Sequence, residues 1–276
     1  MIYTTKENKI IVKDRSQFNP KHILECGQIF CYKKQKDNNY VVFSADKKAS
    51  IVEFDDRIEI QTQDVPYFVN FFDLNTDYSL LKNKFIEEYP YLKNAITFGG
   101  GIRILKQDPF ETIIGFIVSA NNNIKRIQKI MFALREQFGN KMGDYNAFPT
   151  AKQLINASID DLLSIGLGYR AKYIYTACRQ LNDVDYNLLA KLPTNQLNLK
   201  LLQIMGVGQK VADCIMLFAF SKGDVFPVDT WIEKVYCTYF EQEHSRKIIR
   251  QKLLNRFGNN SGYIQQYLFY SQREGA

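Results

Sequence analysis

The pattern of hydrophobic and polar positions divides the chain into a first part that predicts strands and a longer part that predicts helices. Short runs rich in β-branched and aromatic residues, separated by Lys, Asp and Asn, are typical of strands. Five such runs occupy residues 9–12, 28–34, 40–46, 49–54 and 57–63. The sequence KDNN between the second and third runs is a turn signal, so these two runs are predicted to form a hairpin.

From about residue 75 the apolar residues recur at helical spacing, and this period continues to the end of the chain. Asp108 followed by Pro109 predicts a capped helix start, and Thr150 and Ser158 predict two more. Because strands and helices are segregated along the chain, we predict an α+β protein. The expected division is an antiparallel sheet domain with flanking helices over residues 1–95, followed by a helical bundle over residues 96–276.

Composition narrows the chemistry that these domains can perform. The chain has 36 Lys and Arg against 29 Asp and Glu, and the resulting charge of +7 favours an anionic partner. Two histidines are too few for a multi-histidine metal site, and five scattered cysteines form no C-x-x-C pair. We therefore expect no cofactor and no required metal, with lysine, carboxylates or cysteine carrying any catalysis.

A glycine-rich turn between two apolar helices, at about residues 200–220, is the first candidate functional element. Gly206 and Gly208 permit a tight helix–turn–helix, and the N–H groups at the start of the second helix can bind a phosphate. An ordinary corner between two helices would have the same sequence pattern. The turn alone therefore leaves both interpretations open.

Lys210 and Asp229 are the candidate catalytic residues. Lys210 stands at the positive end of the helix dipole among apolar neighbours, which predicts a lowered pKa and a nucleophile able to form a Schiff base. Asp229 follows the same helix and would move a proton or stabilise positive charge on a sugar. The simpler alternatives are a lysine that contacts DNA phosphate and an aspartate that only caps a helix.

Several motifs together resemble the 8-oxoguanine DNA glycosylases of the helix–hairpin–helix superfamily. In chain order they are CGQIF (26–30), LKQDPFETIIGFIVSANNNIKRI (105–127), GLGYRAKYI (166–174), MGVGQKVADC (205–214), VFPVDTW (225–231) and YIQQYLF (263–269). The resemblance implies a TBP-like antiparallel sheet before the helical bundle, with the last helix, 261–274, packing back toward the sheet domain. It also implies that the damaged base is flipped out of double-stranded DNA before it is excised.

The resemblance assigns roles to residues of this chain. Lys210 would attack C1′ of the damaged nucleoside, Asp229 would assist departure of the base, and the Schiff base would allow β-elimination at the abasic site. The lesion pocket would consist of four residues: the Gly27 carbonyl accepting from N7–H, Gln265 on the Watson–Crick edge, and Phe269 and Cys214 on the two ring faces. Read alone, Gly27 is a glycine at the entry of a strand and Cys214 a small buried residue.

The same resemblance predicts the remaining DNA contacts. Asn121 would fill the space left by the flipped base, and the opposite cytosine would be held by Arg126, Tyr169 and Arg170. Phosphate contacts would come from Gly206, Gly208, Gln209 and Trp231, of which Trp231 replaces a histidine of the animal members. A structural cation at the backbone carbonyls of Leu202, Ile204 and Val207 is a further expectation.

Two other functions stay open at this point. The hairpin could belong to a DNA-binding module without catalysis, or the chain could be a glycosylase for a different damaged base. No apolar run reaches membrane-spanning length and the first residues lack an apolar signal core. We therefore expect no membrane contact and a location in the cytoplasm or nucleoid of a prokaryote or in the nucleus of a eukaryote. We also expect a monomer.

Overall fold

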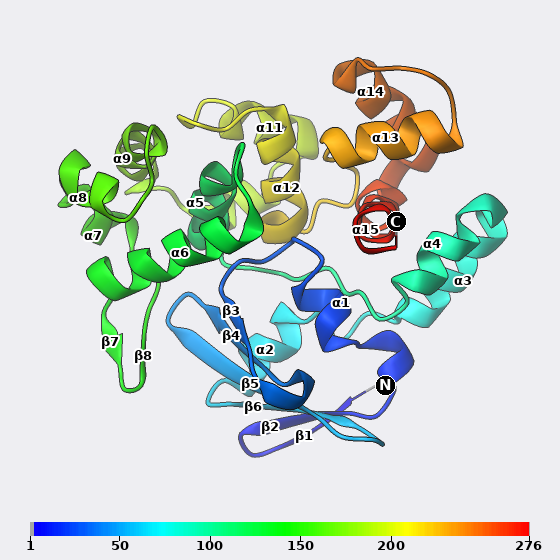
Figure 1. Cartoon of the computed structure of the whole chain (residues 1–276), viewed down its shortest axis with the longest axis horizontal. Helices are drawn as coiled ribbons and strands as arrows, with labels where there is room; N and C mark the ends of the chain where they lie inside the picture. The colour runs from blue at the N-terminus through cyan, green and yellow to red at the C-terminus, as the bar shows by residue number, and fades with distance from the viewer. Residues whose placement is uncertain (1–2, 276) are drawn as a thin grey trace.

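The first part of the chain folds into one six-stranded antiparallel sheet. The structure, a computed structural model, describes residues 3–275 (Figure 1). The order across the sheet is β1 (Tyr3–Lys6), β2 (Lys9–Val12), β6 (Ile58–Thr62), β5 (Lys47–Glu53), β4 (Tyr40–Ser44) and β3 (Tyr32–Lys34). The expected hairpin joins β3 and β4, in which Lys34 is paired with Tyr40.

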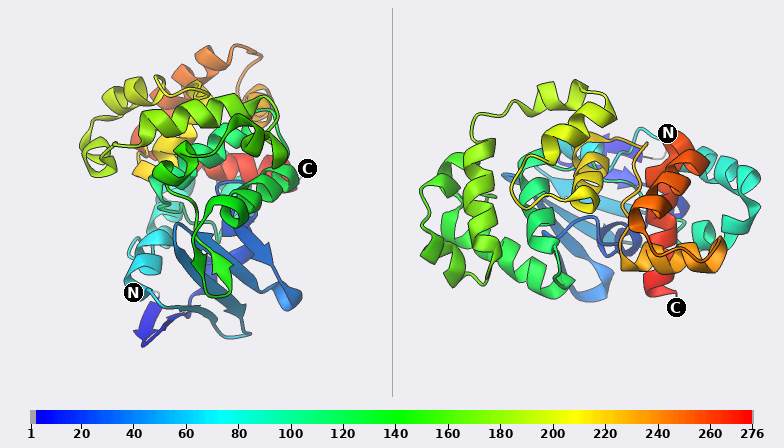
Figure 2. Two further views of the ribbon diagram at one scale, coloured as in Figure 1. Left: turned by 90° about the vertical axis from the view of Figure 1, so that its left-hand side faces the viewer. Right: turned by 90° about the horizontal axis from the view of Figure 1, so that it is seen from above.

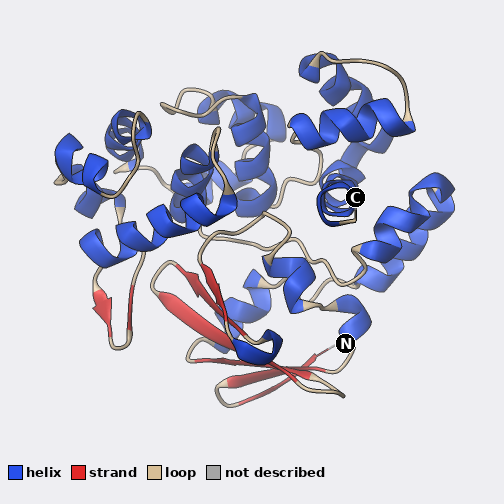
Figure 3. Ribbon diagram, viewed as in Figure 1, coloured by secondary structure: helices blue, strands red, loops and turns tan. Residues whose placement is uncertain are grey.

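Helices make up most of the remaining chain, as Figure 3 shows. Those before residue 100 are α1 (Pro20–Leu24), α2 (Val65–Phe71), α3 (Tyr78–Glu88) and α4 (Lys93–Phe98). The central set comprises α5 (Pro109–Ser119), α6 (Ile124–Phe138), α7 (Ala151–Ile155), α8 (Ile159–Ser164), α9 (Arg170–Leu181), α10 (Tyr186–Lys191), α11 (Thr194–Leu201) and α12 (Gln209–Phe220). The last three are α13 (Thr230–Tyr239), α14 (Arg246–Phe257) and α15 (Ser261–Glu274). A small hairpin of β7 (Lys141–Met142) and β8 (Tyr145–Asn146) follows α6.

The predicted helix starts have the expected caps. The Asp108 carboxylate accepts from Glu111 N at 2.9 Å, and Pro109 is the first helical residue. Thr150 and Ser158 both form capping boxes with the residue three positions later. An antiparallel sheet followed by a helical domain confirms the predicted α+β class.

Three hydrophobic cores hold these layers together. The first lies between the sheet, α1 and α2, and the second joins α5, α6, α9, α11 and α12. The third contains residues of α3, α4, α13, α14 and α15, so that segments far apart in sequence pack together (Figures 1 and 2). Phe85 and Ala95, before the expected division at residue 95, are in the same core as Ile264. The division itself stays a prediction.

The expected strand 28–34 and the start of the chain differ from the prediction. Regular strand pairing begins only at Tyr32, although Cys31 O still accepts from Phe43 N of β4 at 2.9 Å. The buried side chains before it are divided between two cores: Ile29 packs in the core under the sheet, whereas Phe30 and Cys31 pack in the core of the helical layer. Strand β1, for which no prediction was made, pairs with β2 at the edge of the sheet. Segment 26–31 therefore leaves the sheet and passes beneath the helices.

Within residues 3–275, every helix is too short or too polar to cross a lipid bilayer.

Candidate active site and nucleic-acid interface

The turn between α11 and α12 requires glycine at Gly206. This residue has φ +89°, and an added Cβ would lie 3.0 Å from Ile117 Cγ2 and 3.1 Å from Tyr173 Cβ. Gly208 is the N-cap of α12, where no side chain caps the helix. The N–H groups of the first turn therefore remain available for an anion, as the phosphate contacts predicted for Gly206 and Gly208 require.

The side chain of Gln209 is turned into the hairpin. Its Nε2 donates to Asn198 Oδ1 at 2.9 Å and to Asp213 Oδ1 at 3.0 Å. Any phosphate contact of Gln209 would thus come from its backbone N–H.

The carbonyls expected at a structural cation lie on the same turn. Ile204 O accepts from Val207 N at 3.1 Å, and the Leu202 side chain is exposed. In residues 3–275 no three His, Cys, Asp or Glu side chains gather as a metal site would need. A cation there would depend on backbone oxygens alone.

Lys210 is the second residue of α12 and lies between a ring and two acidic groups. Its Nζ is 5.6 Å from the centroid of the Phe116 ring. Burial opposes its charge, but Cys214 and Asp229 outweigh burial, so the pKa of Lys210 is raised above its ordinary value. The expected lowering is wrong, because the helix dipole and apolar neighbours were considered without these two groups. Lys210 is therefore protonated in the free protein at neutral pH.

Asp229 both caps α13 and contributes to the site. Its Oδ1 accepts from Trp231 N and Ile232 N, each at 3.0 Å. These bonds fix the carboxylate at the start of α13, on the side from which its charge stabilises protonated Lys210. The capping role and the proton-transfer role are therefore compatible in one side chain.

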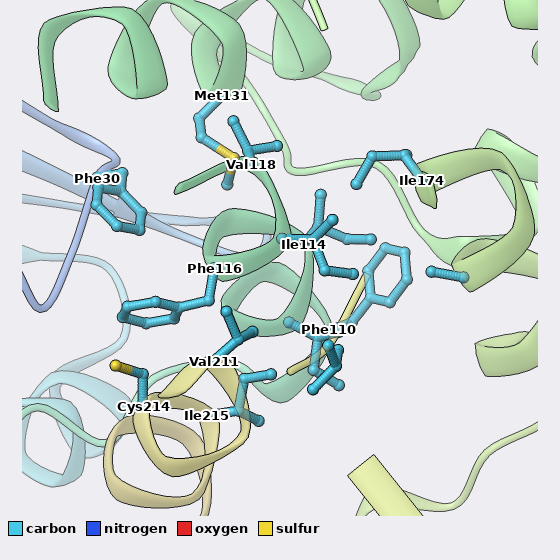
Figure 4. Packing of buried hydrophobic residues seen from close by; sticks show 14 of the residues in the cluster. Phe30, Phe110, Ile114, Phe116, Val118, Met131, Ile174, Val211, Cys214 and Ile215 are labelled. Carbon is cyan, nitrogen blue, oxygen red and sulfur yellow. The ribbon is translucent and has the colours of Figure 1, made fainter. Parts of the chain in front are cut away.

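Cys214 follows Lys210 by one helical turn and is 4% exposed. Burial raises the pKa of its thiol to about 11, so the thiol is neutral at neutral pH and acts on Lys210 by its charge only in the alkaline range, where Lys210 titrates as well. Figure 4 shows Phe116 of α5 and Cys214 of α12 in the contact between these helices. A neutral, polarisable side chain at this place suits the predicted contact with the face of a base.

Gly27 lies against the last helix. It has φ +85°, and an added Cβ would lie 2.9 Å from Arg273 Nη1 and 3.3 Å from Phe269 Cε1. The Arg273 guanidinium stands 5.3 Å from the centroid of the Phe269 ring and donates to the Glu25 carbonyl. Gly27 and Phe269, predicted from opposite ends of the sequence, are thus brought together, and only glycine fits.

Gln265 brings a buried polar atom to α15, the helix that also carries Phe269. It is 5% exposed, and its Oε1 is buried without a hydrogen-bond partner. Buried polar atoms of native proteins are nearly always paired, and this oxygen is free to accept a hydrogen bond, as the predicted contact with a base edge requires. The next residue, Gln266, docks the helix by donating from Nε2 to Cys26 O at 2.9 Å.

Gln28, which sequence reasoning did not single out, holds the Gly27 segment in place. Its fully buried side chain donates to Ile23 O and Arg103 O and accepts from Leu105 N, all at 2.9 Å. These bonds tie segment 26–31 to the loop that precedes α5. Its position in CGQIF could have indicated this role, because a glutamine buried between apolar residues needs hydrogen-bond partners.

The residues predicted to fill the space of the flipped base and to hold the opposite cytosine form a second group, called the wedge here: Asn121 on the loop after α5, Arg126 on α6, and Tyr169 and Arg170 at the start of α9. Asn121 is exposed with φ +50°, a conformation that asparagine tolerates better than most residues. The exposed Arg126 donates from Nη2 to Gly166 O at 3.1 Å, and the Tyr169 hydroxyl donates to Ala120 O at 3.3 Å. Because α5 carries Phe116 and leads into Asn121, one helix connects the pocket with the wedge.

Arg170 has a different place from its predicted partners at the opposite base. It is 3% exposed, and its guanidinium donates to the carbonyls of Ala120 and Asn121, the latter at 2.8 Å. In the free protein Arg170 thus supports the wedge backbone, and a contact with cytosine would require these bonds to be exchanged.

Trp231 lies in the first turn of α13. Its ring is half-buried, and Lys234 Nζ stands 5.1 Å from the ring centroid. The predicted contact with DNA phosphate would therefore place an indole N–H beside a lysine.

Comparison with known proteins agrees with this arrangement. Residues 10–113 match the 8-oxoguanine DNA glycosylase N-terminal domain, and residues 114–258 match the HhH-GPD superfamily base excision DNA repair proteins. The N-glycosylase/DNA lyase of Saccharomyces cerevisiae is 30% identical over 217 residues, 63% of this chain and 58% of that protein. The N-glycosylase/DNA lyase of Arabidopsis thaliana is 30% identical over 72% of this chain and 60% of its own length. The chain thus spans less than two thirds of either protein.

A solved structure matches the whole length. The Clostridium acetobutylicum 8-oxoguanine glycosylase/lyase, in complex with double-stranded DNA containing cytosine opposite 8-oxoguanine, is 35% identical. The match covers 100% of this chain and 99% of that one, with a TM-score of 0.93. A 3-methyladenine DNA glycosylase from Archaeoglobus fulgidus shares the fold with a TM-score of 0.77, at only 17% identity.

The fold and the hairpin lysine define a helix–hairpin–helix base-excision repair protein. Within that superfamily, the chain belongs to the 8-oxoguanine DNA glycosylases.

Proposed function

We propose that the protein is a bifunctional DNA glycosylase and lyase that excises 8-oxoguanine, preferentially opposite cytosine. The observation that carries this function is the placement of Lys210 beside Cys214 and Asp229, because it combines a nucleophile, a pocket wall and a carboxylate. Lys210 would attack C1′ once it has lost its proton, and Asp229 would stabilise the positive charge that develops on the sugar. The base leaves with a proton as the N–C1′ bond forms. Cleavage of the C1′–O4′ bond, with protonation of O4′, then opens the sugar ring and gives the Schiff base at Lys210, which permits β-elimination and strand cleavage.

The pocket supports selection of the oxidised base. Because Gly27 has no side chain, its backbone carbonyl can contact a base edge beside the Phe269 ring. A carbonyl at Gly27 accepts from the N7–H of 8-oxoguanine but opposes the N7 acceptor of guanine. The unpaired Gln265 Oε1 supplies an acceptor for the Watson–Crick edge, where the base carries N–H donors.

Double-stranded DNA is the proposed partner, bound through the α12 N-terminus, the wedge residues and Trp231. The proposed active form is a monomer. The proposed location is that of the genome: cytoplasm or nucleoid in a prokaryote and nucleus in a eukaryote.

Borohydride trapping tests the reaction directly. Duplexes that carry 8-oxoguanine opposite each of the four bases are incubated with the protein and borohydride, and covalent complexes are counted on a denaturing gel. We expect trapping on all lesion duplexes, greatest opposite cytosine, and none on undamaged DNA. A protein that binds these duplexes without trapping would instead be the non-catalytic alternative.

Two substitutions separate recognition of the lesion from recognition of the opposite base. Phe269→Ala removes a stacking surface worth about 1–3 kcal/mol and should slow excision opposite every base. Arg126→Ala removes charge-assisted donors from cytosine, so it should slow excision most opposite cytosine and little opposite adenine. Single-turnover excision against all four opposite bases measures both effects.

The control for Arg126→Ala is Lys125→Ala, because Lys125 is the exposed residue next to Arg126 on α6. It accounts for the loss of one positive charge near DNA. An equal slowing of all four pairings by Arg126→Ala would show that this arginine contacts only the backbone.

A further inference from the structure

A buried ion pair lies behind the reactive lysine and takes no part in the chemistry described so far. Arg250 of α14 donates from Nε to Asp213 Oδ2 at 2.6 Å and from Nη2 to Asp213 Oδ1 at 2.8 Å. Asp213 is fully buried, whereas the Arg250 side chain is 22% exposed. Two parallel bonds of this kind fix both the distance and the orientation of the two helices that carry them.

Asp213 is placed on the helix so that it reaches the site. It follows Lys210 by three residues and Gln209 by four, and both spacings bring side chains together on a helix. Gln209 donates to the same carboxylate and to Asn198 of α11. The network therefore joins α11, α12 and α14 at the end of α12 where Lys210 lies.

Charge around Lys210 depends on whether Asp213 is neutralised. The groups that act on Lys210 are Cys214 and Asp213 of α12 and Asp229 at the start of α13, with the Phe116 ring of α5 opposite. Burial raises the pKa of Asp213, and the bonds from Arg250 oppose that rise. Without Arg250, an ionised Asp213 would add a second uncompensated carboxylate to the one at Asp229.

We propose that Asp213 and Arg250 are positioning residues that set the charge at Lys210, because Arg250 neutralises Asp213 and leaves Asp229 as the carboxylate facing the lysine. This inference rests on the proposed function, in which Lys210 must lose a proton before it attacks. The pair also holds α12 against α14, whose neighbour α13 carries Asp229. Removing either partner thus disturbs the protonation of Lys210 in a direction that depends on which partner is removed.

The test is the pH dependence of single-turnover excision for Asp213→Asn and Arg250→Met. Asp213→Asn removes a negative charge and leaves Arg250 unpaired, so Lys210 loses its proton more readily. The acid limb is the pH range in which the excision rate rises as Lys210 loses its proton. We expect the midpoint of this limb to move to lower pH by about one unit. Arg250→Met leaves the Asp213 carboxylate uncompensated above its own pKa, so the limb should move up by a similar amount.

Shifts of the acid limb in opposite directions in Asp213→Asn and Arg250→Met would not result from a pair with a purely structural role. A pair that only ties two helices would lower the rate at every pH and leave the limb in place, or move it in the same direction in both variants. Either result would overturn the proposal. The double variant Asp213→Asn/Arg250→Met restores neutrality and should bring the limb back to within about 0.3 pH unit of the wild-type position.

Two further variants keep the test decisive. Arg250→Lys keeps the charge but loses the paired geometry, so it should slow excision with little shift of the limb. Lys252→Met removes a charge from the same helix at a residue that pairs with exposed Glu241 instead, and should leave both rate and limb unchanged. If Arg250→Met fails to fold, a downward shift in Asp213→Asn together with an unmoved limb in Arg250→Lys still decides, because a structural pair would move both limbs alike or neither.

Failure of the proposed function would be recognised separately. Wild-type protein that gives no borohydride-trapped complex with 8-oxoguanine DNA would contradict the lysine chemistry itself. Normal trapping by wild-type protein without the opposite shifts would reject only the role of the pair. Melting temperatures of all variants separate loss of fold from loss of rate.

Discussion

Replacing Lys210 by glutamine is expected to abolish covalent trapping and to reduce excision of 8-oxoguanine by about 10⁴-fold or more. Glutamine has similar length but no amine, so it cannot attack C1′ or form a Schiff base. The Lys210 side chain is only half-buried, so the fold should be retained. Single-turnover assays and borohydride trapping on 8-oxoguanine opposite cytosine measure the loss.

Lys210→Arg distinguishes the nucleophile from a simple positive charge. Arginine keeps the cation near DNA but is not a nucleophile at neutral pH, because its pKa is far higher. We expect Lys210→Arg to be as inactive as Lys210→Gln while it binds DNA normally. Lys200→Gln, an exposed lysine at the end of α11, is the matched control and should remain active. Activity in Lys210→Arg would mean that the residue acts only on phosphate.

Replacing Asp229 by asparagine is expected to slow excision by about 10²–10⁴-fold while lesion binding is kept. Asparagine caps helices about as well as aspartate, so the bonds from Trp231 N and Ile232 N should persist. Removal of the carboxylate also lowers the pKa of Lys210, which favours the reactive amine. Slower excision would therefore report the lost negative charge at the sugar, not a more protonated lysine.

Asp185→Asn provides the matched control for the cap. Asp185 is the N-cap of α10 and accepts from Asn187 N and Leu188 N in the same way, away from the site. Both variants should melt close to the wild-type temperature, and only Asp229→Asn should lose excision. An unchanged rate in Asp229→Asn would reduce this residue to a helix cap.

Local signals in the sequence predicted the fold well. Strand β2, the hairpin between β3 and β4, and the caps at Asp108, Thr150 and Ser158 depend on residues close together in the chain. The prediction that a strand begins at residue 28 was wrong, because the structure there depends on residues far away in the chain. Residues 28–31 have the composition of a strand, but Gln28 finds its partners at Arg103 and Leu105, far away in sequence. No local pattern indicates such partners.

The site shows the same limit. The motifs placed Lys210, Asp229 and Gly27 in one candidate site, and the resemblance to the glycosylases is confirmed. The raised pKa of Lys210 depends on Asp229 and Cys214 together, and a helix-dipole argument from its own segment gave the wrong direction. Arg170 was predicted to face DNA, yet in the free protein it binds two carbonyls of the wedge loop. The Arg250 partner of Asp213 carried no signal, because 37 residues separate them.

The docking of α15 on segment 26–31 has a consequence for how the protein is made. Gln266 bonds Cys26 across 240 residues of sequence, and Phe269 lies beside Gly27. A ribosome releases the hairpin that carries Lys210 well before α15, so a growing chain contains the proposed nucleophile before Gln265 and Phe269. Contacts between such distant segments also form slowly. The proposed lesion pocket would therefore be completed last, and a chain truncated before α15 would contain Lys210 but lack two of the four proposed pocket residues.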